Sequence, residues 1–131
     1  FMFQKELGKK IIGVYPSSDY GRIAILSNFR LNVLNKFYVS PNCFFPKPKV
    51  TSMVLHFRAK KKNSFTIKNI SNLEKVTNIL FSNKRKMINK NIKKILTENK
   101  IKDIQDLKLN LRPSDINPEV YYKITELFEK K

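Results

Sequence analysis

The stretch Phe44-Phe45-Pro46-Lys47-Pro48-Lys49-Val50-Thr51-Ser52 places aromatic, proline and lysine residues directly before a segment with the alternation of a β-strand. Each proline fixes its own φ angle and biases the preceding residue toward an extended conformation, so we expect a stiff loop. A stiff loop can hold an aromatic ring in one orientation. Proteins that act on an extruded nucleobase need such a ring, because the base must be stacked and held in place.

Apolar residues alternate with polar ones on both sides of this loop. They are Leu31, Val33, Phe37 and Val39 before the loop and Met53, Leu55 and Phe57 after it. A period of two predicts half-buried strands. We expect the two strands to pair antiparallel, at the edge of a larger sheet.

The first thirty residues are expected to add one strand and two helices. Residues 1–6 have the pattern of a strand. Residues 5–12 predict a short helix that ends at Gly13, because glycine is favoured just after a helix. A polar turn would then lead into a second helix over 20–28.

Beyond residue 60 the apolar period changes to that of a helix. Ser71 and Glu74 form a capping box at the start of one predicted helix. A second helix is predicted over 84–96. The last helix should begin at Asn117-Pro118, with asparagine as N-cap and proline in the first turn.

The change of period divides the 131 residues into two expected domains. Residues 1–59 form the α/β part, which includes the loop at 41–49. Residues 60–131 form the helical part. With 41% hydrophobic residues the chain has enough apolar side chains for a core, so global disorder is not expected.

Charge is the strongest signal in the composition. The chain has 27 Lys and Arg against 10 Asp and Glu, a net charge of +17. This excess implies a polyanionic partner, either a nucleic acid or an anionic membrane. No apolar run approaches the ~18 residues of a membrane span. We therefore expect a cytoplasmic nucleic-acid-binding protein with no membrane partner.

The cations concentrate in the helical part, where 13 Lys or Arg and two acids lie between residues 60 and 102. Few of these cations have acidic neighbours at helical spacing, so they are not neutralised by salt bridges. At ~100° per residue, a helix over 84–96 would have an apolar face and a cationic face. The two sets are Ile88, Ile92, Ile95 and Leu96, and Lys86, Lys90, Lys93 and Lys94. Contacts of this kind bind phosphates without reading sequence, so they do not separate RNA from DNA.

The residue counts argue against a metal site. Cys43 is the single cysteine and His56 the single histidine. One thiol cannot form a disulfide within the chain. A histidine without cysteine or carboxylate neighbours does not make a zinc site.

Five segments, in order, resemble the small-subunit rRNA adenine dimethyltransferases, the kasugamycin-sensitivity enzymes of bacteria. The first two are Phe3-Gln4-Lys5-Glu6, similar to their m-x-Q-K-E, and Tyr20-Gly21-Arg22-Ile23-Ala24-Ile25, similar to Y-G-R-L-S-V. Phe44 to Ser52 resembles their F-x-P-P-P-K-V-x-S loop, with Lys47 in place of the middle proline. The last two are Lys84-Arg85-Lys86-Met87, similar to R-R-K-x-L, and Arg112-Pro113, similar to the start of R-P/R-A-E-x-L.

The resemblance implies a fold class of α/β plus α. The chain would be the C-terminal part of a Rossmann-like S-adenosylmethionine-dependent methyltransferase domain, followed by a small helical rRNA-binding domain. The family's E-x-G-x-G loop, the acid that binds the cofactor ribose, and the N-L-P-Y motif are expected upstream of Phe1. The chain alone is therefore expected neither to bind the cofactor nor to transfer methyl groups.

The full-length protein, by this resemblance, dimethylates adjacent adenines near the 3′ end of small-subunit rRNA during ribosome biogenesis. Its partners would be small-subunit rRNA and the small ribosomal subunit, and it would act as a monomer without a metal. The adenine amino group attacks the methyl group directly in this family. Catalysis is then mainly orientation and desolvation, so no catalytic residue is expected in this chain.

The resemblance also assigns roles to residues. Phe44 is expected to stack on the flipped adenine and Phe45 to pack inside the protein. The rest of the target-adenine group is Pro46, Pro48 and Lys49. Expected at the edge of the site are Gln4, Lys5, Glu6, Tyr20 and Arg22. Expected to grip the rRNA backbone are Lys84, Arg85, Lys86, Lys90, Lys93 and Lys94.

Two other functions fit the same motifs. One is a macrolide-resistance-type methyltransferase of large-subunit rRNA, which has a similar loop. The other is a non-catalytic RNA-binding ribosome-assembly protein of the same fold. An unrelated basic ribosomal protein would explain the charge but not the order of the motifs.

Overall fold

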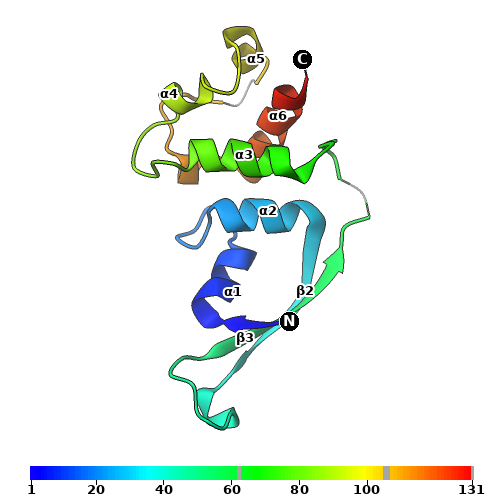
Figure 1. Ribbon diagram of the computed structural model, residues 1–131, viewed down its shortest axis with the longest axis vertical. Coiled ribbons are helices and arrows are strands. Elements are labelled where there is room, and N and C mark those ends of the chain that lie inside the picture. Colours follow the sequence, from blue (N-terminus) through cyan, green and yellow to red (C-terminus); the bar gives the residue numbers. More distant parts are fainter. Residues whose placement is uncertain (62, 105–106, 131) are drawn as a thin grey trace. The chain divides into compact units, whose positions relative to one another are not determined.

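The structure is a computed structural model that describes residues 1–61, 63–104 and 107–130. The chain forms two compact units, a sheet unit, Phe1–Lys62, and a helical unit, Asn63–Lys131 (Figure 1). The division predicted between residues 59 and 60 lies close to this boundary.

The described residues of the sheet unit form three strands, two α-helices and one 3₁₀ turn. In chain order they are β1 (Met2–Gln4), α1 (Lys5–Ile12), α2 (Arg22–Arg30), β2 (Leu31–Val39), η1 (Pro41–Cys43) and β3 (Ser52–Ala59). The described residues of the helical unit form α3 (Ile70–Leu80), α4 (Asn89–Ile92), α5 (Glu98–Lys102), η2 (Pro113–Asp115) and α6 (Pro118–Glu129).

The sheet has the strand order β1-β3-β2, and both pairs are antiparallel. The predicted antiparallel pairing of β2 with β3 is confirmed. The expected fold class, the C-terminal part of a Rossmann-like domain followed by a small helical domain, is wrong for the sheet, although a helical unit does follow it. Rossmann-like sheets are mostly parallel, whereas both strand pairs among the described residues are antiparallel. The loop at 41–49 turns the chain back, so β3 runs against β2.

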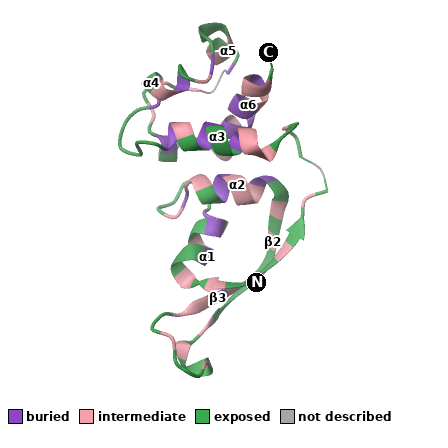
Figure 2. Ribbon diagram, viewed as in Figure 1, coloured by how far each residue is buried: buried purple, intermediate pink, exposed green. Residues whose placement is uncertain are grey.

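Helix α1 covers one face of this sheet. Met53 and Leu55 of β3 are each 1% exposed and form a core with Ile11 of α1. Figure 2 shows buried residues among exposed ones along α1, as expected of a helix with one face on the sheet. A Cβ atom at Gly8 would lie 2.5 Å from the Sδ atom of Met53. The missing side chain of Gly8 therefore allows the helix to lie close against β3.

Strand β2 does not keep one apolar face along its length. A register shift between Val33 and Asn35 inserts an extra residue against β3. Such a bulge reverses which side chains face the core. Val33 therefore pairs with Phe57 on the core side, but Phe37, which was predicted to be half-buried with it, is 54% exposed.

The turn between α1 and α2 is closely packed. Helix α1 ends at Gly13 as predicted, with φ +34° and its N–H bonded to the carbonyl of Lys9 at 2.8 Å. The second helix starts at Arg22, two residues later than predicted, because Tyr20 is buried and belongs to the turn. The Tyr20 ring packs edge-on against Tyr15 at 5.0 Å between ring centres.

The helical unit is built on the packing of α3 against α6. The fully buried side chains at its centre are Leu73, Val76, Leu80, Ile88, Ile92, Tyr121 and Ile124. The last helix begins at Asn117-Pro118 as predicted. The predicted capping box is wrong, because Asn69 caps α3 by accepting from the Ser71 N–H at 3.0 Å, which places Ser71 inside the helix.

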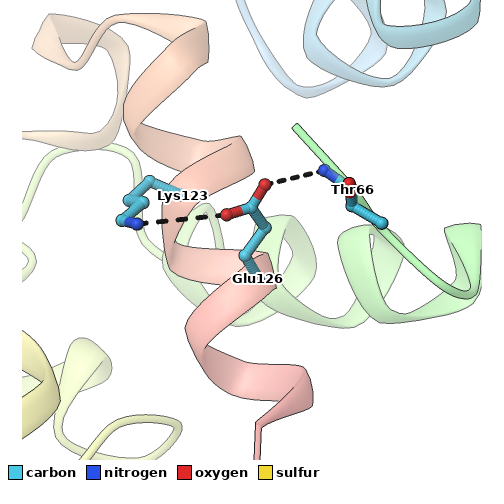
Figure 3. A network of polar contacts seen from close by, with 3 residues as sticks. All are labelled: Thr66, Lys123 and Glu126. Atoms are coloured by element: carbon cyan, nitrogen blue, oxygen red, sulfur yellow. Dashed lines mark hydrogen bonds and ion pairs between the residues drawn. The ribbon is translucent and has the colours of Figure 1, made fainter. Parts of the chain in front are cut away.

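Two carboxylates of α6 hold the segment that leads into α3. Glu126 accepts a hydrogen bond from the Thr66 N–H at 2.7 Å and lies 4.0 Å from the ammonium of Lys123 (Figure 3). Glu129, one turn later, accepts from the backbone N–H groups of Lys68 and Asn69 at 2.9 and 3.0 Å.

The same Glu129 carboxylate also accepts from the Asn72 side chain at 2.7 Å. Partial burial raises the pKa of Glu129, but the hydrogen bonds from Asn72, Lys68 and Asn69 outweigh it, and the net pKa is lowered. Hydrogen bonds to the charged form of a carboxyl stabilise that form.

We predict that Glu129→Gln lowers the free energy of unfolding of the helical unit by on the order of 1 kcal/mol at neutral pH, since the site is partly exposed. A carboxyl with a lowered folded pKa stabilises fully above its unfolded pKa, and the effect is lost as pH falls through the folded value. The variant should therefore lose less stability than wild type on acidification. Urea unfolding at several pH values, followed by NMR signals of α3 and α6, measures this.

Glu98→Gln, a change at an exposed carboxylate of α5, is the matched control and should keep the wild-type pH dependence. Equal pH dependence in wild type and Glu129→Gln would contradict the prediction.

Candidate nucleic-acid interface

The loop predicted to hold a base is ordered by its own backbone. Ser40 caps η1 with its hydroxyl, which accepts from the Asn42 N–H at 3.2 Å. The Phe44 N–H then bonds to the carbonyl of Pro41 at 3.2 Å. The loop therefore begins with a closed turn that fixes the backbone where Phe44 leaves it.

The two aromatic rings of the loop differ in exposure. Phe44 is half-buried, whereas Phe45 is 101% exposed. The expectation that Phe45 packs inside the protein is wrong, because none of the described residues covers its ring. Of the remaining loop residues, Pro48 is half-buried, and Pro46 and Lys49 are exposed.

The structure brings the end of this loop to the start of the chain. The Lys5 N–H bonds to the carbonyl of Thr51 at 3.0 Å. A pocket of about 210 Å³ lies at this junction, lined by Gln4, Lys5, Glu6, Val50 and Thr51. Three residues predicted at the edge of the site therefore lie next to the target-base loop, although they are distant in sequence.

The other two predicted edge residues are placed differently. Tyr20 is 5% exposed and packs on Tyr15, so it braces the turn before α2. Arg22 is half-buried in the first turn of α2.

The helix predicted over 84–96 is wrong in extent, since only α4, Asn89–Ile92, is helical there. Asparagine side chains bond to the nearby backbone and so compete with the helix. Asn83 accepts from the Arg85 N–H at 3.2 Å, and Asn89 accepts from the Lys90 N–H at 3.0 Å. In such a helix Lys86 and Lys90, and Lys90 and Lys94, would be like charges four residues apart, which also disfavours a helix.

This irregular segment is anchored to the core by two isoleucines. Ile88 and Ile92 are fully buried. The Ile88 N–H also bonds to the carbonyl of Leu111 at 2.9 Å. That bond brings residue 112, far along the chain, beside the segment that follows α3.

The result is a pocket of about 740 Å³, which we call the cationic pocket. Its lining includes five cations and no carboxylate. The lining residues are Ser82, Asn83, Arg85, Lys86, Met87, Asn89, Lys90, Asn91, Lys94 and Arg112. Guanidinium and ammonium groups that converge on one space favour phosphate groups.

Four of the six residues predicted to bind rRNA line the cationic pocket, while Lys84 and Lys93 do not. Arg112 was missed as a site residue. Its proline neighbour was the available signal, because Pro113 starts a 3₁₀ turn that fixes the chain at this point.

Tyr121 contacts the two chain segments that lie on either side of the cationic pocket. Its hydroxyl donates to the carbonyl of Pro113 at 2.5 Å. Its ring stacks on Phe81, the residue directly after α3, with 5.5 Å between ring centres. The residues on either side of the pocket, Ser82 and Arg112, directly adjoin these two contacts.

Over residues 1–61, 63–104 and 107–130, no group of three or more His, Cys, Asp or Glu is placed to hold a metal ion. Within those same ranges, no helix is both long and apolar enough to cross a bilayer.

The family model described as ribosomal RNA adenine dimethylase matches residues 1–130. A ribosomal RNA small subunit methyltransferase A of Pelagibacter ubique is 40% identical over 129 residues, which are 98% of this chain and 49% of that protein. The protein of the same name from Malacoplasma penetrans is 35% identical over 126 residues, 94% of this chain and 46% of that protein. The chain thus spans about half the length of these relatives.

Solved structures share the fold. A dimethyladenosine transferase from Plasmodium falciparum superposes with a TM-score of 0.72 at 20% identity, over 94% of this chain and 54% of that one. The 23S rRNA methyltransferase ErmE gives 0.64 at 16% identity, over 98% of this chain and 53% of that one. These matches cover about half of each related protein and do not support the expected assignment of the chain to the C-terminal portion.

We predict that replacing Lys86, Lys90 and Lys94 together by Gln weakens binding of single-stranded RNA and lowers the salt dependence. Each lost phosphate contact reduces the slope of log K against log salt by ~0.7, so the slope should fall by about 2. Fluorescence anisotropy at several salt concentrations measures both quantities.

Lys75, Lys102 and Lys108 provide the control. They are exposed, belong to the same unit and lie outside the pocket, so their triple Gln variant has the same net charge. Equal loss of affinity in the two triple variants would show that overall charge acts, and not the cationic pocket.

Proposed function

The chain belongs to the ribosomal RNA adenine dimethylase family, and we propose that it serves as an RNA-contacting part of an S-adenosylmethionine-dependent enzyme that dimethylates adenines of small-subunit rRNA. The names of the relatives, ribosomal RNA small subunit methyltransferase A, support this substrate. The small ribosomal subunit in the cytoplasm is the proposed partner.

The cationic pocket is the observation that carries the proposal. Its lining has five cations and no carboxylate, so its field attracts an anion from every side. The buried anchors Ile88 and Ile92 hold the backbone in place, so little ordering is needed when RNA binds. In the proposed complex, phosphates of the rRNA lie in this pocket and fix how the protein sits on the subunit.

The aromatic loop has the second role in the proposal. Phe44 stacks on the adenine that leaves the RNA helix, and Phe45 offers a further exposed ring. Base stacking on an aromatic ring contributes ~1–3 kcal/mol per base. A stacked adenine has its amino nitrogen held in one orientation. The rate of methyl transfer depends on that orientation, because the attack is direct.

S-adenosylmethionine would supply the methyl group. In an E-x-G-x-G loop a single residue separates the two glycines. The chain's glycines, Gly8, Gly13 and Gly21, are spaced more widely, so they do not form such a loop and do not fit the cofactor. The proposal therefore gives this chain RNA contacts and no step of cofactor binding.

We predict that Phe44→Ala, introduced into the complete reading frame, lowers methyl transfer to immature small subunits by roughly 5- to 150-fold, the equivalent of ~1–3 kcal/mol of lost stacking. Subunit binding should be largely kept, since phosphate contacts remain. Incorporation from labelled S-adenosylmethionine, together with a subunit pull-down, measures both quantities.

Phe37→Ala is the control, because Phe37 is an exposed ring that belongs to β2 and not to the loop. It should leave transfer unchanged. If Phe45→Ala loses methyl transfer while Phe44→Ala keeps it, the stacking role belongs to Phe45 instead. Absence of incorporation by the wild-type protein, with salt-sensitive subunit binding, would indicate an assembly factor without activity.

We further predict that the 131-residue chain alone shows no stoichiometric binding of S-adenosylmethionine in isothermal titration calorimetry. The same preparation must bind RNA, which shows that it is folded. Saturable one-to-one binding of the cofactor would contradict the prediction.

A further inference from the structure

We propose that a second pocket, in the sheet unit, binds one nucleotide of the RNA through its phosphate, its ribose and its base. It is a pocket of about 250 Å³, which we call the Tyr38 pocket. This inference rests on the proposed function and adds a contact to it. The lining residues are Lys9, Ile12, Gly13, Val14, Ser17, Asp19, Lys36, Tyr38 and Met53.

The register of the sheet places the key side chains together. Tyr38 pairs with Met53, and Lys36 pairs with Leu55. Directly paired residues share a face of a sheet, and Met53 and Leu55 are buried on the face covered by α1. The bulge near Val33 changes which side chains of β2 face α1. Lys36 and Tyr38 therefore lie on the side of the sheet that α1 covers.

One lysine lies over the Tyr38 ring and two others line the pocket. Lys5 and Lys9 are one turn apart on α1, so they lie on the same side of the helix. The Lys5 Nζ atom lies 5.6 Å from the centre of the Tyr38 ring. Lys9 and Lys36 line the pocket from α1 and β2, so a phosphate between them would meet two positive charges.

The far wall is set by a tight turn. At Gly13 the φ angle is +34°, and a Cβ atom there would lie 2.4 Å from the Ala24 Cβ and 3.1 Å from the Asp19 carbonyl oxygen. The Tyr20 N–H closes the turn on the Ser17 carbonyl at 3.2 Å. The turn is therefore fixed before any ligand arrives.

Asp19 and Ser17 of this turn line the pocket together with Lys9 and Lys36, so a carboxylate and a hydroxyl belong to its lining as well as two ammonium groups. A carboxylate repels a phosphate but accepts hydrogen bonds from sugar hydroxyls. The 2′-hydroxyl is the group that distinguishes RNA from DNA. Tyr38 is 51% exposed and offers ring surface to a base.

The lining therefore matches the three parts of a ribonucleotide. A simple anion would be repelled by the Asp19 carboxylate, and an apolar ligand would gain nothing from the charges of Lys9 and Lys36. The volume is below the ~300–1,000 Å³ of most small-molecule sites, which fits one nucleotide of a longer strand.

A Tyr38→Trp variant tests the proposal, because the chain contains no tryptophan and the new fluorophore would report only on this pocket. Single-stranded RNA should quench its fluorescence on stacking. In the same background, Lys9→Gln with Lys36→Gln should weaken the quenching titration roughly tenfold and lower its salt slope by ~1.4. Asp19→Asn should reduce the preference for RNA over DNA of the same sequence.

Lys10→Gln is the control for Lys9→Gln alone, because each removes one charge from α1 and Lys10 is exposed and does not line the pocket. It should leave the titration within twofold of the parent. NMR shifts of the Gly13 amide in the otherwise unchanged chain, titrated with the same RNA, provide a reading that does not depend on Tyr38→Trp.

The outcomes separate this proposal from the proposed function. RNA binding that responds to the cationic pocket, with no quenching and no shift at Gly13, would overturn only the Tyr38 pocket. Equal loss in Lys10→Gln and in Lys9→Gln alone would overturn it as well, because charge alone would then explain the effect. A chain that binds no RNA at all would overturn both proposals.

Discussion

The hydrogen bond from the Tyr121 hydroxyl to the carbonyl of Pro113 is the contact on which the cationic pocket depends. It joins the middle of α6 to the residue after Arg112, while the same ring stacks on Phe81 at the end of α3. Tyr121 is fully buried, so a single core side chain fixes both walls of a charged surface site. A buried hydroxyl must keep its partner or incur a desolvation cost, which ties the position of Arg112 to the stability of the core.

At a net charge of +17 the cations repel one another, so a backbone anchored to the core is needed to keep them together. Like charges that converge on one space repel each other, and a flexible chain would separate them. In the helical unit the cations are attached to a backbone that cannot move apart, because Ile88 and Ile92 are buried beneath them. An anion bound among these cations would reduce that repulsion. Both pockets follow this arrangement, with lysines at the rim and apolar residues underneath.

The sequence predicted those elements whose signals are local. The strands around the loop, the glycine that ends α1 and the Asn117-Pro118 start of α6 were each predicted, because alternation and caps act over a few residues. The failures have non-local or competing causes. The bulge at Val33 reversed which side chains of β2 face the core, so Phe37 is exposed. Asparagine side chains that bond to the nearby backbone interrupt the helix predicted over 84–96. The expected Rossmann-like sheet is mostly parallel, whereas both strand pairs of the described sheet are antiparallel. Arg112 joined the cations through the Ile88–Leu111 bond, which no local pattern encodes.

The central claim is that this chain contacts rRNA through the cationic pocket and the aromatic loop. The most direct measurement is photo-crosslinking of the complete protein to immature small subunits, with the crosslinked residues identified by mass spectrometry. We predict crosslinks within residues 82–94 and at Phe44 or Phe45. Crosslinks confined to other surfaces of the chain, with neither of these segments attached to rRNA, would contradict it.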